Sequence, residues 1–295
     1  MNHTTLLIFK LVAETQSVTQ AAKQLGRAQS NITTRIQQLE EELEAELFVR
    51  GNKKMLLSPA GQNFLSYARR ILSLAEEAKL ALHPARPTGT LKLGAMEACA
   101  ASRLPAILPL FQQRCPDADL TLRTMPTRQL TELVENATLD CALVSLPAGP
   151  DGSLQCPQTL EYLPLFIEQL VLISPVDGRD YRFAAFPAGC TYRQRGIEYL
   201  QQTGTHVDIV EVSSYHAMMA NVATGRYACL LPESVLPLLT LPAGCQTQYV
   251  TQAATQLIWR RGYVSPILDA LRQLLLAPAA GNQPGGSQQH AAGRQ

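Results

Sequence analysis

The first 57 residues place apolar side chains at helical spacing, and this pattern predicts three short helices. The first helix contains the apolar cluster Leu6–Val12. Ser17 caps the second, Val18–Leu25, which ends at Gly26, a residue free to adopt a positive φ. The third runs from about 28 to 39. Only a few residues separate the second helix from the third, and helix, tight glycine-containing turn and helix are the form of a helix-turn-helix.

Two short apolar runs follow and predict a small hairpin, the wing of a winged helix. Leu47–Arg50 and Met55–Leu57 lie on either side of the polar turn Gly51–Lys54. Ser58 and Pro59 then begin a long helix, with serine at the N-cap and proline in the first turn.

The long helix carries apolar residues in steps of four and three over about three heptads. Such a seam packs either on its own domain or on a partner helix. Its length and the polar remainder of the helix favour a partner helix, and therefore a dimer. The predicted dimerisation residues are Phe64, Ala68, Ile71, Ala75, Ala78 and Leu82.

From Gly89 onwards the pattern changes to strands alternating with helices, after a proline-containing linker at 83–88. The candidate strands include Gln169–Ser174 and Gln256–Trp259. This alternation predicts a mostly parallel sheet covered by helices. The stretch 278–295 has no periodic apolar face and is predicted to be disordered.

The composition fits a globular chain and excludes one that binds nucleic acid by being basic all over. The 295 residues suggest about two domains, 46% of them are hydrophobic, and the net charge is +1. Five glutamates lie between Arg35 and Arg50. The near-zero net charge therefore averages over acidic and basic groups that are clustered separately along the chain.

Cysteine spacing and hydropathy argue against several classes of protein. The seven cysteines are scattered with no pair at C-x-x-C spacing, which argues against a zinc site or a disulfide framework. No cleavable signal is recognisable, and no apolar run approaches the ~20 residues of a membrane span. We therefore expect a cytoplasmic protein with no membrane partner.

Polar side chains in the first two turns of the third helix, opposite Ile32 and Ile36, predict DNA recognition. Arginine pairs with guanine edges, asparagine and glutamine pair with adenine edges, and hydroxyls bond bases or phosphates. A solvated helix face would explain any one of these residues, but explains less well their collection beside a helix-turn-helix. The candidate DNA-binding residues are Ser17, Thr19, Gln20, Gln29, Ser30, Asn31, Thr33, Thr34, Arg35, Gln38, Arg50, Lys53 and Lys54.

Five motifs, in order within the first 61 residues, resemble those of the LysR-type transcriptional regulators. They are Ser17–Ala22, Ser30–Ile36, Gln38–Leu43, Leu47–Arg50 and Leu57–Gly61. The resemblance extends to about residue 277, because the strand–helix part resembles that family's type 2 periplasmic-binding-protein-like effector domain. In one departure, Ala28 stands where many members have a capping serine.

The resemblance implies an α/β chain with an all-α winged helix-turn-helix, a long dimerisation helix and a two-lobed effector domain. We place the DNA-binding domain at 1–59, with the helix-turn-helix at about 18–37, and the linker helix and hinge at 60–88. The effector-binding domain takes 89–277, with lobe I at about 89–163 and 264–277 and lobe II at about 164–263. The resemblance further implies a homodimer that assembles into a homotetramer, binds and bends double-stranded promoter DNA, and has RNA polymerase as a further partner.

Within the family, the effector part resembles a subgroup represented by putrescine-utilisation regulators and YofA/SoxR-like regulators. Leu93–Glu97, Arg103–Pro105, Phe186–Arg193, Ser214–His216 and Trp259–Gly262 carry this resemblance.

A two-lobed α/β receptor binds its ligand between the lobes, at the carboxyl ends of strands and the N-termini of helices. Backbone N–H groups there favour a carboxylate, whereas Glu97 favours an ammonium, so an amine, an amino acid or a small organic acid fits. The candidate effector-binding residues are Glu97, Ala98, Cys99, Ser102, Met125, Thr127, Arg128, Gly189, Cys190, Tyr192, Ser214, Tyr215 and His216.

Two other classes compete with a regulator. An enzyme would use Cys190 and His216 as nucleophile and base, but no third orienting residue, nucleophile elbow or phosphate-binding glycine loop accompanies them. We therefore predict no catalytic residue, metal or cofactor. A solute-binding receptor without DNA function is opposed by the first 57 residues.

Overall fold

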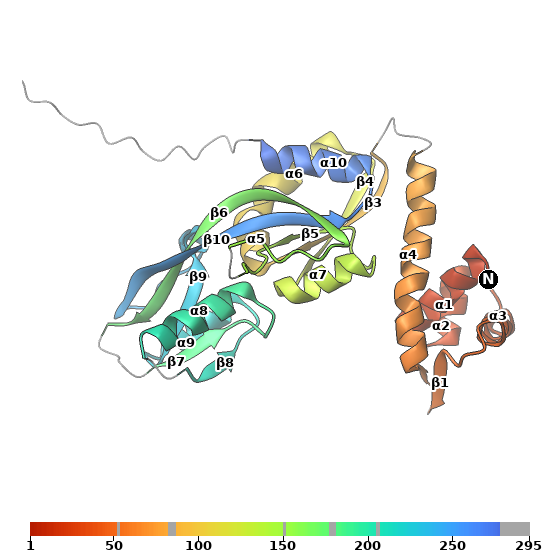
Figure 1. Ribbon diagram of the computed structural model, residues 1–295, viewed down its shortest axis with the longest axis horizontal. Coiled ribbons are helices and arrows are strands. Elements are labelled where there is room, and N and C mark those ends of the chain that lie inside the picture. Colours follow the sequence, from red (N-terminus) through yellow and green to blue (C-terminus); the bar gives the residue numbers. More distant parts are fainter. Residues whose placement is uncertain (52–53, 82–86, 150–151, 177–180, 205–206, 278–295) are drawn as a thin grey trace, which may run out of the picture.

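A computed structural model describes the chain except for residues 52–53, 82–86, 150–151, 177–180, 205–206 and 278–295. The described residues form an N-terminal part and a larger C-terminal part, each with its own hydrophobic core. Helix α4 lies along the side of the N-terminal part that faces the C-terminal part (Figure 1). Across the described residues, we find no helix long and apolar enough to cross a membrane.

The N-terminal part is a helix-turn-helix with a two-stranded wing, as the sequence predicts. Its elements are α1 (His3–Thr15), α2 (Val18–Leu25), α3 (Gln29–Glu42), β1 (Phe48–Gly51), β2 (Lys54–Leu57) and α4 (Pro59–Ala81). The Ser17 hydroxyl accepts a hydrogen bond from the Gln20 N–H at 3.3 Å and caps α2. Gly26 ends α2 with φ at +61°, so the two helices of the motif are joined by a tight turn.

Hydrogen bonds from backbone N–H groups of the wing and its entry fix the wing to the helices. The Glu40 carboxylate accepts from the N–H groups of Leu47 and Phe48 at 2.8 and 3.1 Å, and so anchors β1 to α3. The Met55 N–H donates to the Gln16 carbonyl at 3.1 Å and holds β2 against the end of α1. The wing therefore has one orientation relative to α3.

On the long helix α4, some of the residues predicted to form the dimerisation seam pack inside the N-terminal part instead of facing solvent. Ala68 is fully buried and the Phe64 ring lies 5.1 Å from that of Phe9, so both pack inside their own domain. At these two residues the apolar spacing serves the domain core, and their role in dimerisation stays a prediction. Ile71 is 40% exposed. Leu82 lies outside the described residues.

The C-terminal part has two lobes of strands and helices. Lobe I contains β3 (Gly89–Ala95), α5 (Glu97–Ser102), α6 (Leu104–Arg114), β4 (Ala118–Thr124), α7 (Thr127–Glu135), β5 (Cys141–Val144) and α10 (Pro266–Leu276). Lobe II contains β7 (Arg182–Ala185), α8 (Thr191–Gln202), β8 (Ile209–Glu211), α9 (Tyr215–Val222), β9 (Tyr227–Pro232) and the 3₁₀-helix η1 (Glu233–Leu238).

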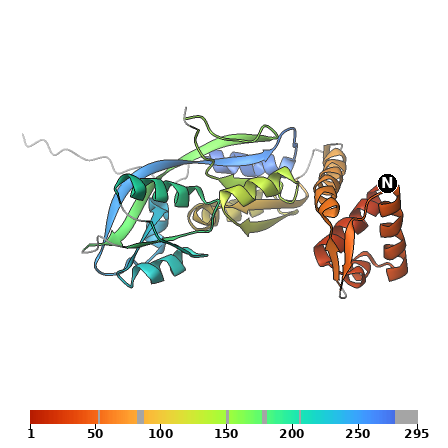
Figure 2. The same cartoon turned by 60° about the horizontal axis from the view of Figure 1, so that its bottom comes forward.

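Two long strands, β6 (Leu160–Pro175) and β10 (Cys245–Arg260), run through both lobes (Figures 1 and 2). The strand order is β4-β3-β5-β10-β6-β9-β7-β8. The outer strands of each lobe pair in parallel, as predicted, whereas β10 is antiparallel to β5 and β6, and β6 is antiparallel to β9. The expectation of a mostly parallel sheet thus fails at the centre, where the chain crosses between lobes.

Candidate DNA-binding surface and effector site

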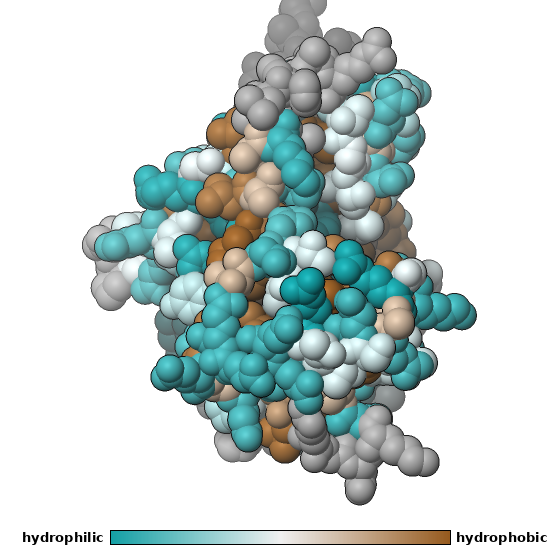
Figure 3. Space-filling model, turned by 90° about the vertical axis from the view of Figure 1, so that its right-hand side faces the viewer, coloured by the Kyte–Doolittle hydropathy of each residue, from teal (hydrophilic) through white to brown (hydrophobic). Residues whose placement is uncertain are grey.

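Helix α3 lies at the outer edge of the N-terminal part, on the far side from the C-terminal part (Figure 1). Ile32, Ile36 and Leu39 are buried and attach one face of α3 to the domain core. The opposite face carries exposed polar side chains, namely Gln29, Ser30, Asn31, Thr33, Thr34 and Gln38. Seen from that side, the molecule is mostly hydrophilic, interrupted by an apolar band (Figure 3).

The other predicted DNA-contacting residues surround this face. Arg35 is half-buried on α3, while Thr19 and Gln20 are exposed on α2. Lys54 is exposed on the wing; Lys53 and the side chain of Arg50 lie outside what the structure describes.

The first turn of α3 is open to an acceptor. Its N-cap is Ala28, whose side chain offers no hydrogen bond to that turn, although the Asn31 N–H donates to the Ala28 carbonyl at 3.1 Å. The N–H groups of a helix's first turn that lack an intrahelical partner are suited to an anion such as a phosphate oxygen.

A cavity of about 220 Å³, which we call the interlobe cleft, opens between the lobes. It is lined by the segments that follow β3, β4, β7 and β8, so it lies where the two-lobed architecture predicts a ligand. Of the predicted effector residues, the lining contains Glu97, Ala98, Met125, Thr127, Cys190, Tyr192 and Tyr215. The sequence prediction missed Met96, Thr124, Pro126, Gln129, Phe186, Pro187 and Ser213, which line it as well.

The walls of the interlobe cleft are largely apolar and uncharged. The Phe186 and Tyr215 rings meet edge to face with centroids 5.0 Å apart. Burial raises the pKa of the Tyr192 and Tyr215 hydroxyls well above the ordinary tyrosine value, and raises the pKa of the Cys190 thiol. These groups are therefore neutral near pH 7, and Glu97 is the only carboxylate or cation among the described lining residues.

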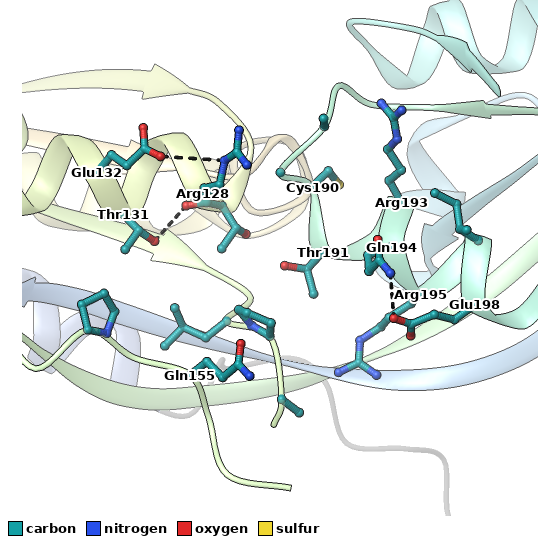
Figure 4. A pocket seen from close by; sticks show the side chains of 18 of the residues that line it. Arg128, Thr131, Glu132, Gln155, Cys190, Thr191, Arg193, Gln194, Arg195 and Glu198 are labelled. Carbon is teal, nitrogen blue, oxygen red and sulfur yellow. Dashed lines mark hydrogen bonds and ion pairs between the residues drawn. The ribbon is translucent and has the colours of Figure 1, made fainter. Parts of the chain in front are cut away.

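A second and larger space, of about 840 Å³, lies between α7 and α8; we call it the outer cavity (Figure 4). Thr127, Arg128, Gly189 and Cys190 of the predicted set line it. The Arg128 N–H donates to the Gly189 carbonyl at 3.2 Å, and this bridge joins the lobes. Gly189 has a φ of +95°, and a Cβ there would lie 3.0 Å from the Arg128 Cβ, so the close approach favours glycine.

Four predicted effector residues, Cys99, Ser102, Ser214 and His216, line neither the interlobe cleft nor the outer cavity. Cys99 is buried in the core, where burial raises its pKa to about 12. The Ser102 hydroxyl donates to the Ala98 carbonyl at 2.8 Å and lies 3.2 Å from the Ser234 hydroxyl. Ser214 caps α9 by accepting from the Ala217 N–H at 3.1 Å, and His216 is exposed on that helix.

The described residues contain no group of three His, Cys, Asp or Glu side chains able to hold a metal ion. The raised pKa keeps the Cys190 thiol protonated near neutral pH, which is the unreactive form.

A winged helix-turn-helix joined through a long helix to a two-lobed, ligand-receptive α/β domain defines a DNA-binding transcription regulator of the one-component class. The family comparisons specify it further. Residues 3–62 match the family model of a bacterial regulatory helix-turn-helix protein of the lysR family, and residues 84–280 match the LysR substrate binding domain. The chain belongs to the LysR family of DNA-binding transcriptional regulators, and is not an enzyme.

Relatives agree with this assignment, and solved structures share the fold. The chain is 35% identical to the regulator YofA of Bacillus subtilis over 78% of this chain and 81% of that protein. It is 34% identical to the regulator SoxR of an Arthrobacter species over 79% of this chain and 81% of that protein. A full-length OxyR variant from Pseudomonas aeruginosa has the same fold, with a TM-score of 0.73 at 19% identity over 96% and 99% of the two chains. Full-length CbnR in complex with its target DNA also has this fold, with a TM-score of 0.62 at 22% identity over 93% of this chain and 99% of that chain.

Proposed function

We propose that the protein binds a specific promoter sequence through α3 and the wing, and that a small molecule in the interlobe cleft controls this binding. The observation that carries the proposal is that α3 has one buried apolar face and one exposed polar face. One face is fixed in the domain core by Ile32, Ile36 and Leu39, and the other presents a polar row to solvent. A rigidly held helix with exposed amide and hydroxyl groups and a half-buried arginine is suited to read base edges in the major groove.

In this proposal the candidate residues divide into base readers and backbone contacts. Arg35, Asn31 and Gln29 read base edges, because their donors and acceptors match guanine or adenine. Lys53 and Lys54 on the wing contact phosphates, which makes binding sensitive to salt.

The effector class is an amine, an amino acid or a small organic acid. Glu97 favours an ammonium, and the apolar walls with Phe186 and Tyr215 suit a chain or ring. This arrangement supports the subgroup resemblance to putrescine-utilisation regulators, whereas the helix N-termini at the cleft, which have no side-chain cap, suit a carboxylate. The effector can control DNA binding only if it binds one arrangement of the molecule better than another.

The assembly is a homodimer, and a homotetramer as a dimer of dimers, working in the cytoplasm. Two recognition helices on paired α4 helices read half-sites about one helical turn apart, or a multiple of that. RNA polymerase is the further partner at the promoter. The division into a DNA-binding domain at 1–59, a linker at 60–88 and an effector domain at 89–277 belongs to the same proposal.

Two measurements test the proposal. Fluorescence anisotropy with the DNA upstream of its own gene should give tight, salt-sensitive binding that unlabelled random DNA competes away only at large excess. A thermal-shift screen of amines, amino acids and organic acids should find a compound that raises the melting midpoint, because a ligand of the native state stabilises it. Equal affinity for random DNA would refute the sequence-specific role.

A further inference from the structure

One arginine in the outer cavity has no partner. Arg195 lies on α8, and its Nε–H is buried without a hydrogen-bond acceptor. Within the residues that the structure describes, its guanidinium forms neither a hydrogen bond nor an ion pair. Figure 4 shows it projecting from α8 into the open space, towards the side on which Gln155 lies. A buried guanidinium N–H without an acceptor costs free energy, and a ligand that brings an acceptor to this guanidinium would offset that cost.

The other charged groups of the outer cavity already have partners. Arg193 pairs with Glu211 at 2.6 Å and also donates to the Phe186 carbonyl, while Arg128 lies 3.8 Å from Glu132. The remaining carboxylates also have donors, since Glu198 accepts from Gln194 at 2.9 Å and Glu135 from Thr159 at 2.6 Å. Arg195 is therefore the group left to bind a charge of opposite sign.

We propose that the outer cavity is a second ligand site, which takes a small carboxylic acid with an apolar body. The carboxylate would pair with Arg195, whose planar fork matches a carboxylate in two parallel hydrogen bonds. The apolar body has matching walls in Leu146, Pro147, Ala148 and Ile197. The volume of about 840 Å³ is in the range of sites for small organic ligands.

This site is separate from the interlobe cleft but mechanically linked to it. The Arg128–Gly189 bridge lies between the two spaces, and Thr127 and Cys190 line both. Arg195 belongs to lobe II, whereas Leu146 and Gln155 belong to lobe I, so a ligand that contacts both sides stabilises one relative position of the lobes. Binding in the two spaces is then coupled, and by linkage each ligand changes the affinity for the other by the same factor.

The test uses the full-length protein and two probe acids, phenylacetate and hexanoate, each compared with its neutral amide. Isothermal titration should detect both acids and neither amide. An Arg195→Gln variant should lose at least ~10-fold in affinity, the loss expected when a charge-assisted hydrogen-bond pair is removed. Arg226→Gln changes an exposed arginine of the same lobe that lines neither space, and is the matched control with unchanged affinity.

Two further variants locate the binding. Ala148→Phe fills the outer cavity from an exposed position and should abolish probe binding even if Arg195→Gln proves unstable. Glu97→Gln changes only the interlobe cleft and should retain it. The proposal is overturned if neither acid binds, if the amides or inorganic phosphate bind equally well, or if Glu97→Gln rather than Ala148→Phe removes binding. None of these outcomes depends on the effector of the interlobe cleft.

Discussion

Single side chains in the N-terminal part fix the position of the wing and α4 relative to α3, the helix proposed to read DNA. Glu40 bonds two backbone N–H groups of the wing, and Ser58 donates to the Glu46 carbonyl at 2.6 Å while accepting from the Gly61 N–H at 2.9 Å. A Cβ on Gly61 would lie 2.0 Å from the Leu47 carbonyl oxygen, so α4 can begin against β1 only with glycine there. The motif residues that mark the family thus include structural contacts around the DNA surface.

We expect Glu40→Ala to destabilise the N-terminal part by about 1–3 kcal/mol, because it leaves buried backbone donors at Leu47 and Phe48 without an acceptor. Urea unfolding of the full chain, followed by circular dichroism, measures the effect on the first transition. Glu41→Ala removes an adjacent, exposed carboxylate and serves as the control. Equal unfolding curves for the two variants would contradict the anchoring role.

Arg35→Ala tests the proposed reading of bases. A guanidinium bonded to a guanine edge contributes ~1–3 kcal/mol of discrimination, so we expect specific affinity to fall by roughly 10-fold to 100-fold, with little change on random DNA. Anisotropy titrations on promoter and random duplexes give both numbers. Lys23→Ala, an exposed cation of α2 outside the candidate set, is the control. An equal loss on both duplexes would assign Arg35 to the phosphates instead.

At the scale of elements, periodicity predicted where helices and strands form better than which face they bury. The helix-turn-helix followed from Ser17, Gly26 and the apolar spacing, because those signals are local. In β10 only Gln256–Trp259 was predicted, since its first half is largely exposed and carries no apolar alternation. For Ser102, Ser214 and His216 the segment was right but the direction of the side chain was not, because helix capping and side-chain direction depend on three-dimensional packing.

The exposed stripe of α4 is the structural basis for a prediction about assembly. Tyr67, Ile71 and Leu74 are 52%, 40% and 66% exposed and recur in steps of four and three, the spacing of a helix-pairing seam. Their exposure in the single chain fits coverage by a second α4. We therefore predict a pairing seam through these three residues rather than through Phe64 and Ala68, which pack against the domain core.

Replacing both Ile71 and Leu74 by aspartate should convert the proposed dimer to a monomer, because buried like charges at a paired seam repel. Light scattering after size exclusion measures the mass, and promoter affinity should fall with it as one of two half-site contacts is lost. Gln62→Asp introduces the same charge at an exposed polar position of α4 and should leave the mass unchanged. A double variant with wild-type mass would place the dimer contact elsewhere.

At the scale of the whole molecule, the two parts are connected by a partly buried contact at the end of β10. The Arg260 guanidinium donates to Glu77 at 3.1 Å and to Ser73 at 3.0 Å, both on α4, and also to the Leu139 carbonyl at 2.9 Å. The side chains of Arg260 and Glu77 are only 13% and 16% exposed. Because β10 runs through both lobes, Arg260 is a residue through which a change in their relative position would reach α4.

We therefore expect Arg260→Gln and Glu77→Gln to weaken the connection between effector binding and DNA binding while leaving each site intact. A double-mutant cycle on unfolding free energy should give a coupling of ~0.5–3 kcal/mol, the range for contacting charged residues. In either variant, an effector found by thermal shift should still raise the melting midpoint but change promoter affinity less than in the wild type. Arg261→Gln alters the neighbouring arginine, whose side chain is 66% exposed, and should keep the full effect. If all three variants transmit the effector signal as the wild type does, the lobes reach α4 by another route.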